Sequence, residues 1–96
     1  MDELFARQIA ILRKLVEDYR KKEIGLNALI QRIEGIGSVL SIEAWSNAVF
    51  PIVLSLEQIN AMALNAKREP TASERTSIEG SLLELETLIK RFEAKV

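Results

Sequence analysis

Apolar side chains that recur at alternating steps of four and three residues constrain the fold of this chain more than any other feature. Near the amino terminus the repeat runs through Phe5, Ile9, Leu12, Val16 and Tyr19. Side chains at these steps lie on one face of an α-helix, while the opposite face is charged. The pattern predicts an amphipathic helix over residues 2–22, with an acidic first turn and a basic last turn that both complement the helix dipole.

A second and shorter repeat follows residue 25. It consists of Leu26, Leu29, Ile30, Ile33 and Ile36. Gly35 and Gly37 come at its end, and glycine is frequent just beyond the last turn of a helix. We expect the second helix to end at one of these glycines and Ser41 to act as the N-cap of the next helix. A helix that continues through both glycines is the less favoured alternative.

The third predicted helix covers residues 42–67 and contains Pro51, which lacks a backbone N–H and clashes with the preceding helical turn. A kink or break near residues 47–50 is therefore expected. Residues 48–54 are apolar on almost every side of a helix. This distribution predicts that the third helix is the most buried and the central one. The helix should end before Pro70, because the residue preceding a proline is disfavoured in helical geometry.

A fourth helix is predicted to begin at Thr71, which Glu74 follows at the spacing of a capping box. Its apolar repeat again alternates four and three, through Ile78, Leu82, Leu85, Ile89 and Phe92. Amphipathic helices with short connections assemble most economically as an up-and-down bundle. We therefore predict an all-α protein, a single domain over residues 1–96, folded as an antiparallel bundle of about four helices.

The absence of cysteine and histidine limits the chemistry that the chain can perform. It offers no thiolate nucleophile, no imidazole base and none of the usual zinc ligands. Its glutamates lack the histidine that completes the di-iron motif of helical bundles, and its glycines lack the sequence context of a phosphate-binding loop. We predict a protein that is not an enzyme and that uses neither a metal ion nor another cofactor.

Net charge and hydropathy narrow the class of protein further. The chain has 13 basic and 14 acidic residues, whereas nucleic-acid binding draws much of its affinity from basic side chains that neutralise phosphates. The most apolar stretch, residues 48–56, is about half of the roughly 20 residues that a membrane-spanning helix needs. The first residues lack the basic start and apolar run of a secretory signal. These features predict a cytoplasmic protein that binds neither membranes nor nucleic acid directly.

The distribution of charge along the chain is the best indication of function. Between residues 33 and 66 the only charged residues are Glu34, Glu43 and Glu57. A local acidic surface steers a basic partner and raises the rate of association. The alternative, to which we give equal weight, is that the three glutamates only keep an apolar segment soluble.

Two aromatic residues and one amide are ambiguous from the sequence. Trp45, the only tryptophan, is either a core anchor, which we favour, or a contact in a binding interface, where tryptophan is enriched. Tyr19 is a second candidate for an apolar contact. Asn60 either fixes the register of two helices from a buried position or faces solvent.

Three segments carry a resemblance to a known family. They are residues 25–36 (GLNALIQRIEGI), the pair Ala44-Trp45 and residues 56–61 (LEQINA). With them the chain, over about residues 10–66, resembles the small helical immunity proteins of bacterial contact-dependent growth inhibition and related polymorphic toxin systems. The resemblance implies a cytoplasmic protein that binds and neutralises the carboxy-terminal toxin domain of a large exported protein. Many such toxins are nucleases with basic clefts, and the family favours a transfer-RNA nuclease.

Together these observations give a hypothesis for binding. Glu34, Glu43 and Glu57 would meet basic residues of the toxin at its active site or at a nearby exosite, and Trp45 or Tyr19 would supply an apolar anchor. Two alternatives remain at this point. One is a helical adaptor or homo-oligomer that uses exposed parts of the first and fourth helices. The other is a nucleic-acid regulator, whose basic surface would consist of Arg13, Lys14, Arg20, Lys21 and Lys22.

Overall fold

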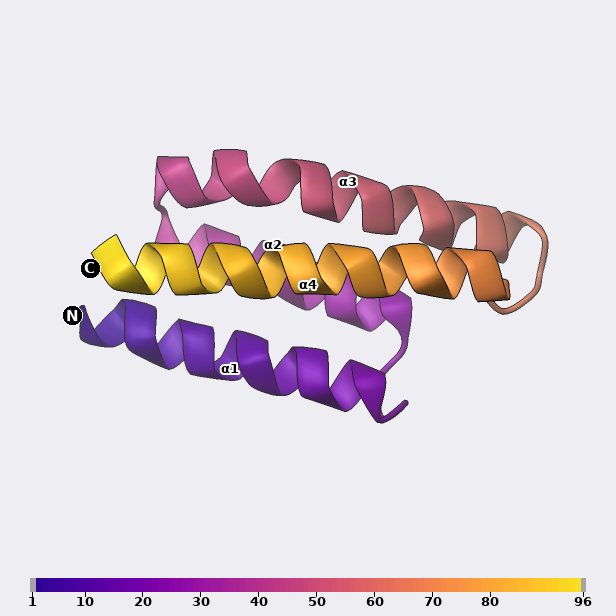
Figure 1. Ribbon diagram of the computed structural model, residues 1–96, viewed down its shortest axis with the longest axis horizontal. Helices are drawn as coiled ribbons and strands as arrows, with labels where there is room; N and C mark the ends of the chain where they lie inside the picture. The colour runs from indigo at the N-terminus through magenta and orange to yellow at the C-terminus, as the bar shows by residue number, and fades with distance from the viewer. Residues whose placement is uncertain (1, 96) are drawn as a thin grey trace.

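The computed structural model describes residues 2–95 and contains four helices: α1 (Glu3–Arg20), α2 (Leu26–Leu40), α3 (Glu43–Asn65) and α4 (Ala72–Lys95). The helices run alternately up and down and form an elongated bundle of 43 × 24 × 20 Å (Figure 1). Within residues 2–95 there is no β-strand. The predicted antiparallel bundle of four helices is confirmed.

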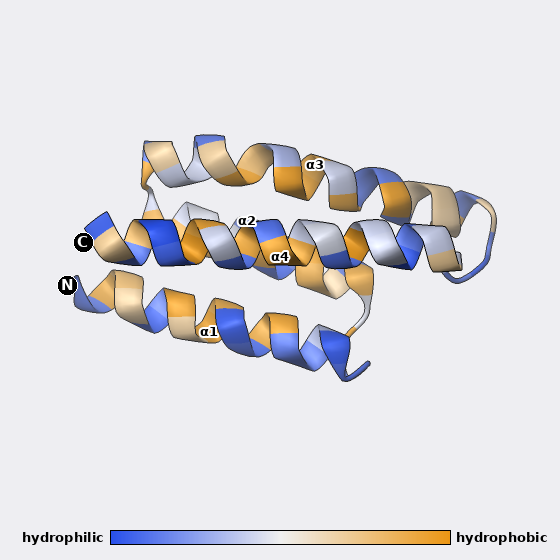
Figure 2. Ribbon diagram, viewed as in Figure 1, coloured by the Kyte–Doolittle hydropathy of each residue, from blue (hydrophilic) through white to orange (hydrophobic). Residues whose placement is uncertain are grey.

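The core forms where the apolar faces of the four helices meet (Figure 2), and α3 also carries exposed apolar side chains on its outward face, among them Phe50 and Leu64. At one end of the bundle three aromatic rings from α1, α3 and α4 pack edge to face. The ring centroid of Trp45 lies 6.5 Å from that of Phe5 and 5.3 Å from that of Phe92. Edge-to-face pairs add to the stabilisation that burial itself provides. This cluster joins the two terminal helices to the start of α3.

The second helix is longer than predicted, because α2 continues through Gly35 and Gly37 to Leu40. Ser41 is not the N-cap of α3. It is the C-cap of α2, with a left-handed φ of 51°, and its backbone N–H donates to the carbonyl of Gly37. The buried side chains of Ile36 and Leu40 explain the continuation. Their burial stabilises this turn by more than the roughly 1 kcal/mol by which each glycine disfavours it.

The third helix, α3, is one continuous helix with Pro51 inside it, so of the predicted kink or break the break does not occur. Pro51 lies on the exposed side of α3, where water can hydrate the carbonyl of Asn47 that has lost its hydrogen-bond donor. The expectation that α3 is the most buried helix is wrong, since six of its 23 residues are buried, against six of 15 in α2, and Phe50 and Leu54 of its apolar segment are exposed. The helix packs against both α2 and α4.

Among the described helices, α3 alone has the length and composition of a membrane-spanning segment, with a mean hydropathy of 1.2 over its most apolar window, in which 28% of the residues are buried. Core helices of soluble bundles have the same composition, because one face is packed against neighbouring helices. In α3 that face includes Trp45, Val49 and Leu56.

The predicted capping box at the start of α4 is confirmed. The backbone N–H of Glu74 donates to Thr71 Oγ1 over 3.1 Å, and the backbone N–H of Thr71 donates to Glu74 Oε1 over 2.9 Å. Arg68 also donates to the Glu74 carboxylate. The hydrogen bonds from Arg68 and Thr71 lower the pKa of Glu74 to about 2. The start of α4 is thereby fixed relative to the connection that follows α3.

Candidate protein-binding surface

The surface along the seam between α2 and α3 holds two of the three predicted glutamates together. Its register is marked by a hydrogen bond in which Asn60 Nδ2 donates to Asn27 Oδ1 over 3.2 Å. Glu34 lies seven residues after Asn27, and Glu57 lies three residues before Asn60, so both project from the outer side of the same seam. Asn60 is half-buried, so it matches neither alternative fully, and its hydrogen bond links α3 to α2 at the edge of the core.

Glu34 lies near enough to Glu57 for its own ionisation to be affected. The pKa of Glu34 is raised, first by partial loss of hydration and then by a hydrogen bond to the Glu57 carboxyl and by its negative charge. Like charges held together disfavour the ionised state of both groups. Neither carboxylate forms an ion pair with a basic side chain within residues 2–95. Both carboxylates are therefore free to form ion pairs with basic side chains of another molecule.

Apolar side chains lie beside the carboxylates on α3. Glu43, Phe50, Glu57 and Leu64 follow one another at seven-residue steps, which is close to two turns, so they form one stripe along the helix. Phe50 is 63% exposed and Leu64 is 64% exposed. Each step advances about 10.5 Å along the axis, which places Phe50 midway between the two glutamates. We call this stripe, together with Glu34, the α2–α3 face.

The structure does not bring all five predicted contact residues to this face. Trp45 is fully buried in the core, so its interpretation as a core anchor is correct and it does not provide an exposed contact. Tyr19 is half-buried near the end of α1, where it lines a pocket with Arg75 and Ile78 of α4. Burial raises the pKa of its phenol. Tyr19 thus lies on the α1–α4 side of the bundle, away from Glu34 and Glu57.

Sequence reasoning missed Phe50 and Leu54, which are 63% and 42% exposed. Both were assigned to the core because they belong to the most apolar part of the chain. A signal for Phe50 was present in the sequence, since it stands seven residues from Glu43 and from Glu57 and therefore shares their side of the helix. Phe50, and not Trp45, is therefore the exposed aromatic side chain of α3.

The opposite seam, between α1 and α4, has its charges paired within the protein. Arg13 and Glu93 form an ion pair of 2.6 Å, and Arg20 pairs with Glu79 at 2.7 Å and with Glu86 at 2.9 Å. Lys14 and Lys21 pair with acidic residues of α1 itself. Four of the five basic residues considered for a nucleic-acid surface are engaged in these pairs. The basic surface that a nucleic-acid regulator needs is therefore largely neutralised.

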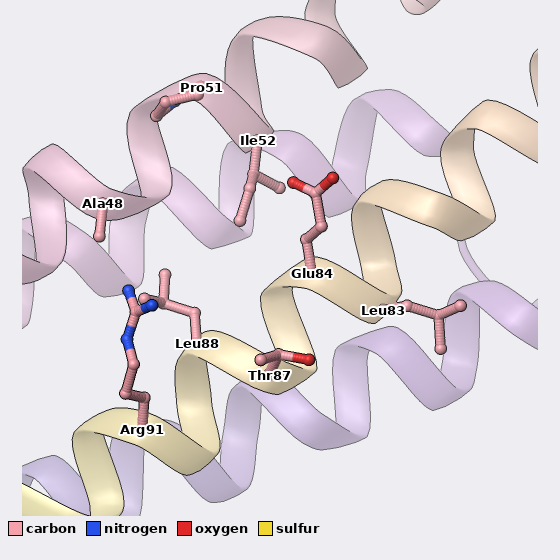
Figure 3. Close-up of a pocket in the computed structure, with 8 residues that line it drawn as sticks. All are labelled: Ala48, Pro51, Ile52, Leu83, Glu84, Thr87, Leu88 and Arg91. Atoms are coloured by element: carbon pink, nitrogen blue, oxygen red, sulfur yellow. The ribbon is translucent and has the colours of Figure 1, made fainter.

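A groove of about 430 Å³ lies between α3 and α4 (Figure 3). It is lined by Ala48, Pro51, Ile52, Leu83, Glu84, Thr87, Leu88 and Arg91. The groove is open and largely apolar, and it has no pair of titratable groups placed for acid–base chemistry. Within residues 2–95 no three acidic side chains gather in a way that would hold a metal ion.

Comparison of the chain with protein-family models, with curated protein sequences and with solved structures yields no match. The fold is a four-helix bundle. Along its α1–α4 seam acidic and basic side chains pair with each other, whereas the α2–α3 face presents unpaired carboxylates and exposed apolar side chains.

Proposed function

We propose that this protein is an immunity protein that binds a basic toxin domain through the α2–α3 face and blocks its activity. The observation that supports the proposal is the exposed, unpaired couple Glu34 and Glu57 beside the exposed ring of Phe50. Protein interfaces combine an aromatic anchor with charges that complement those of the partner. An acidic face of this kind fits a protein whose own surface is basic.

The electrostatics of the couple favour a cationic partner. Like charges held close together repel each other, and the raised pKa of Glu34 is a perturbation of a kind that gathers at functional sites. An arginine or lysine of the partner placed between Glu34 and Glu57 would remove their repulsion and form charge-assisted hydrogen bonds. Glu43, about 21 Å from Glu57 along the axis of α3, would extend the attraction over a broader basic surface and steer the encounter.

The inhibitory step is occlusion. Nucleases bind phosphates through basic clefts, and a rigid bundle that presents carboxylates competes with nucleic acid for the same side chains. Phe50, at the middle of the stripe, is placed to fill an apolar pocket of the partner. The toxin class, with a transfer-RNA nuclease preferred, and the cytoplasmic location come from the resemblance to contact-dependent growth inhibition immunity proteins.

Calorimetric titration of this protein into the toxin domain encoded immediately upstream of its gene tests the proposal, with nuclease activity followed in parallel. We expect nanomolar binding that abolishes activity. Glu34→Lys and Glu57→Lys should each weaken binding at least tenfold and reduce its dependence on salt. Glu69→Lys, at an exposed position in the connection between α3 and α4, is the matched control. Wild-type affinity in all the α2–α3 variants would contradict the assignment of this face.

The apolar part of the face is tested separately with Phe50→Ala. Loss of an aromatic anchor typically weakens an interface by a factor of about 30 or more. Leu83→Ala is the control, because Leu83 is similarly exposed at 55% but lies on α4. An equal effect of both substitutions would place the interface elsewhere. No binding of wild-type protein to a folded, active toxin domain would contradict the immunity function for that pair.

A further inference from the structure

The groove between α3 and α4 carries two opposite charges that the rest of the protein does not use. Glu84 and Arg91 lie seven residues apart on α4, about 10.5 Å along its axis, and both side chains point across the groove toward α3 (Figure 3). Thr87 and Leu88 lie between them. The wall that α3 supplies consists of Ala48, Pro51 and Ile52, so no charged residue of α3 lines the groove.

Neither charge has a partner at helical spacing. The residues four positions away are Gly80 and Leu88 for Glu84, and Thr87 and Lys95 for Arg91. Within residues 2–95 neither side chain takes part in an ion pair. The other glutamates of α4 behave differently, since Glu79, Glu86 and Glu93 pair with arginines of α1 and Glu74 pairs with Arg68.

The arrangement of these charges is self-complementary. A twofold axis that passes α4 between Thr87 and Leu88 exchanges positions 84 and 91. Two copies of α4 packed antiparallel about this axis would set Glu84 of each copy opposite Arg91 of the other. Isologous interfaces of this type use the same patch on both subunits. We infer that the α3–α4 groove is a homodimer interface and that its occupant is a second copy of this chain.

The side chains along the groove suit a close approach of two helices. Gly80, Thr87 and Ala94 repeat at seven-residue steps on the outer side of α4, and small or short side chains reduce the distance between packed helices. Leu83, 55% exposed, borders the groove. We expect an interface confined to one groove between two helices to bury less than the roughly 800 Å² per subunit of a standard interface. A dimer with micromolar or weaker affinity is therefore expected.

This dimer is independent of toxin binding. The groove is on the α4 side of α3, whereas Glu34, Phe50 and Glu57 are on the α2 side. A twofold pairing through α4 leaves both copies of the α2–α3 face accessible. The dimer would therefore present two toxin-binding faces, and its presence or absence can be measured without any toxin.

Sedimentation velocity of the purified chain, from micromolar to millimolar concentration, tests the inference. Wild-type protein should shift from monomer to dimer as its concentration rises. Glu84→Arg and Arg91→Glu should each weaken dimerisation at least tenfold, because each places like charges opposite each other twice. Glu69→Arg and Lys90→Glu make the same charge changes at exposed positions outside the groove and should leave dimerisation unchanged. Circular dichroism confirms that each variant is folded.

Charge exchange makes the test specific for the antiparallel geometry. An equimolar mixture of the Glu84→Arg and Arg91→Glu proteins restores both ion pairs in a mixed dimer, and the double variant restores them in a homodimer. Both should recover wild-type affinity to within a few-fold. A wild-type protein that stays monomeric at millimolar concentration, or a mixture that fails to dimerise when the single variants also fail, would overturn the inference.

Discussion

Trp45 shows at the scale of a residue how a core can hold an unmet polar group. Its side chain is fully buried, and its indole Nε1–H has no hydrogen-bond partner among residues 2–95. A buried donor without an acceptor costs about 1 to 3 kcal/mol. Gly37 of α2 lies next to this indole, and a Cβ added at Gly37 would be 3.9 Å from Trp45 Nε1. A side chain at position 37 therefore has room, and a suitable one would bring an acceptor to the indole.

We predict that Gly37→Ser raises the free energy of unfolding by about 1 to 2 kcal/mol. Serine is a better helix residue than glycine, and its hydroxyl oxygen can accept from Trp45 Nε1–H. Gly37→Ala is the matched control, because it supplies the gain in helix propensity without the acceptor. Chemical denaturation followed by tryptophan fluorescence measures both. If the alanine variant is the more stable of the two, the hydroxyl does not reach the indole.

The couple of Glu34 and Glu57 gives a prediction about pH. The pKa of Glu34 is raised in the folded protein by burial and by Glu57. An acid whose folded pKa exceeds its unfolded value binds more protons in the native state, so the contribution of Glu34 to stability is most favourable at low pH and falls as pH rises from its unfolded pKa through its folded pKa. Glu34→Gln removes this repulsion. It should stabilise the protein at neutral pH by about 0.2 to 0.5 kcal/mol, the scale of exposed like-charge pairs screened by water.

The same measurement repeated below about pH 3 provides the control for Glu34→Gln, because the glutamate is then protonated in both states. The gain in stability should vanish there. A gain that is independent of pH would show that hydration or packing, and not charge, is responsible. A stabilising substitution that also weakens toxin binding would be the trade-off between stability and function that binding sites often show.

At the scale of elements, α2 and α3 differ from their sequence expectations for the same reason. Gly35, Gly37 and Pro51 are local signals against a helix, and each was read as the end or the break of one. In the folded protein the residues around them bury apolar side chains, including Ile36, Leu40 and Ile52. The burial of these neighbouring side chains outweighs the unfavourable local propensity of the glycines and of the proline. The sequence could not show this, because the outward position of Pro51 depends on how α3 packs.

Pro51 gives the prediction for this scale. Pro51→Ala restores a backbone N–H that can donate to the carbonyl of Asn47 and removes the clash with the preceding turn. We expect the free energy of unfolding to rise by about 1 to 3 kcal/mol, reduced somewhat by the greater flexibility of the unfolded chain. Thermal unfolding monitored by circular dichroism checks this. Pro70→Ala, in the connection outside the helices, should give no such gain, and an equal effect of both would point to the unfolded state.

At the scale of the whole molecule, the sequence was sufficient for the four helices, their antiparallel order and most of the core. The 4–3 repeats identify which face of each helix is buried, and Thr71 with Glu74 marks the start of α4. The arrangement of the outer surface could not be predicted. Whether Glu34, Glu57 and Tyr19 share a face depends on which helices are neighbours and on the rotation of each one, and the hydrophobic repeat does not determine either. From the sequence alone one could predict only that Glu43, Phe50 and Glu57 share one side of a helix, because their spacing is seven residues.

Ion pairs between α1 and α4 connect the first helix of the bundle with the last. Arg20, in the last turn of α1, joins Glu79 and Glu86 of α4 and so connects the first helix with the last. Its hydrogen bonds lower the pKa of Glu86. A carboxylate with a lowered folded pKa stabilises the protein above its unfolded pKa, and this contribution is lost as pH falls through the folded value.

We therefore expect Arg20→Ala to lower the free energy of unfolding by about 1 kcal/mol at pH 7, the upper end for exposed pairs, because it leaves two carboxylates without a cation. The difference from wild type should shrink in high salt, which screens the pairs, and at pH values below the folded pKa of Glu86. Arg32→Ala is the control, since Arg32 is exposed and takes part in no ion pair within residues 2–95. Urea denaturation at several pH values and salt concentrations measures the free energy of unfolding of wild type, Arg20→Ala and Arg32→Ala. If the loss in free energy of unfolding of Arg20→Ala depends on neither pH nor salt concentration, the arginine acts through the packing of its aliphatic stem. The ion pairs would then have no part in holding α1 against α4.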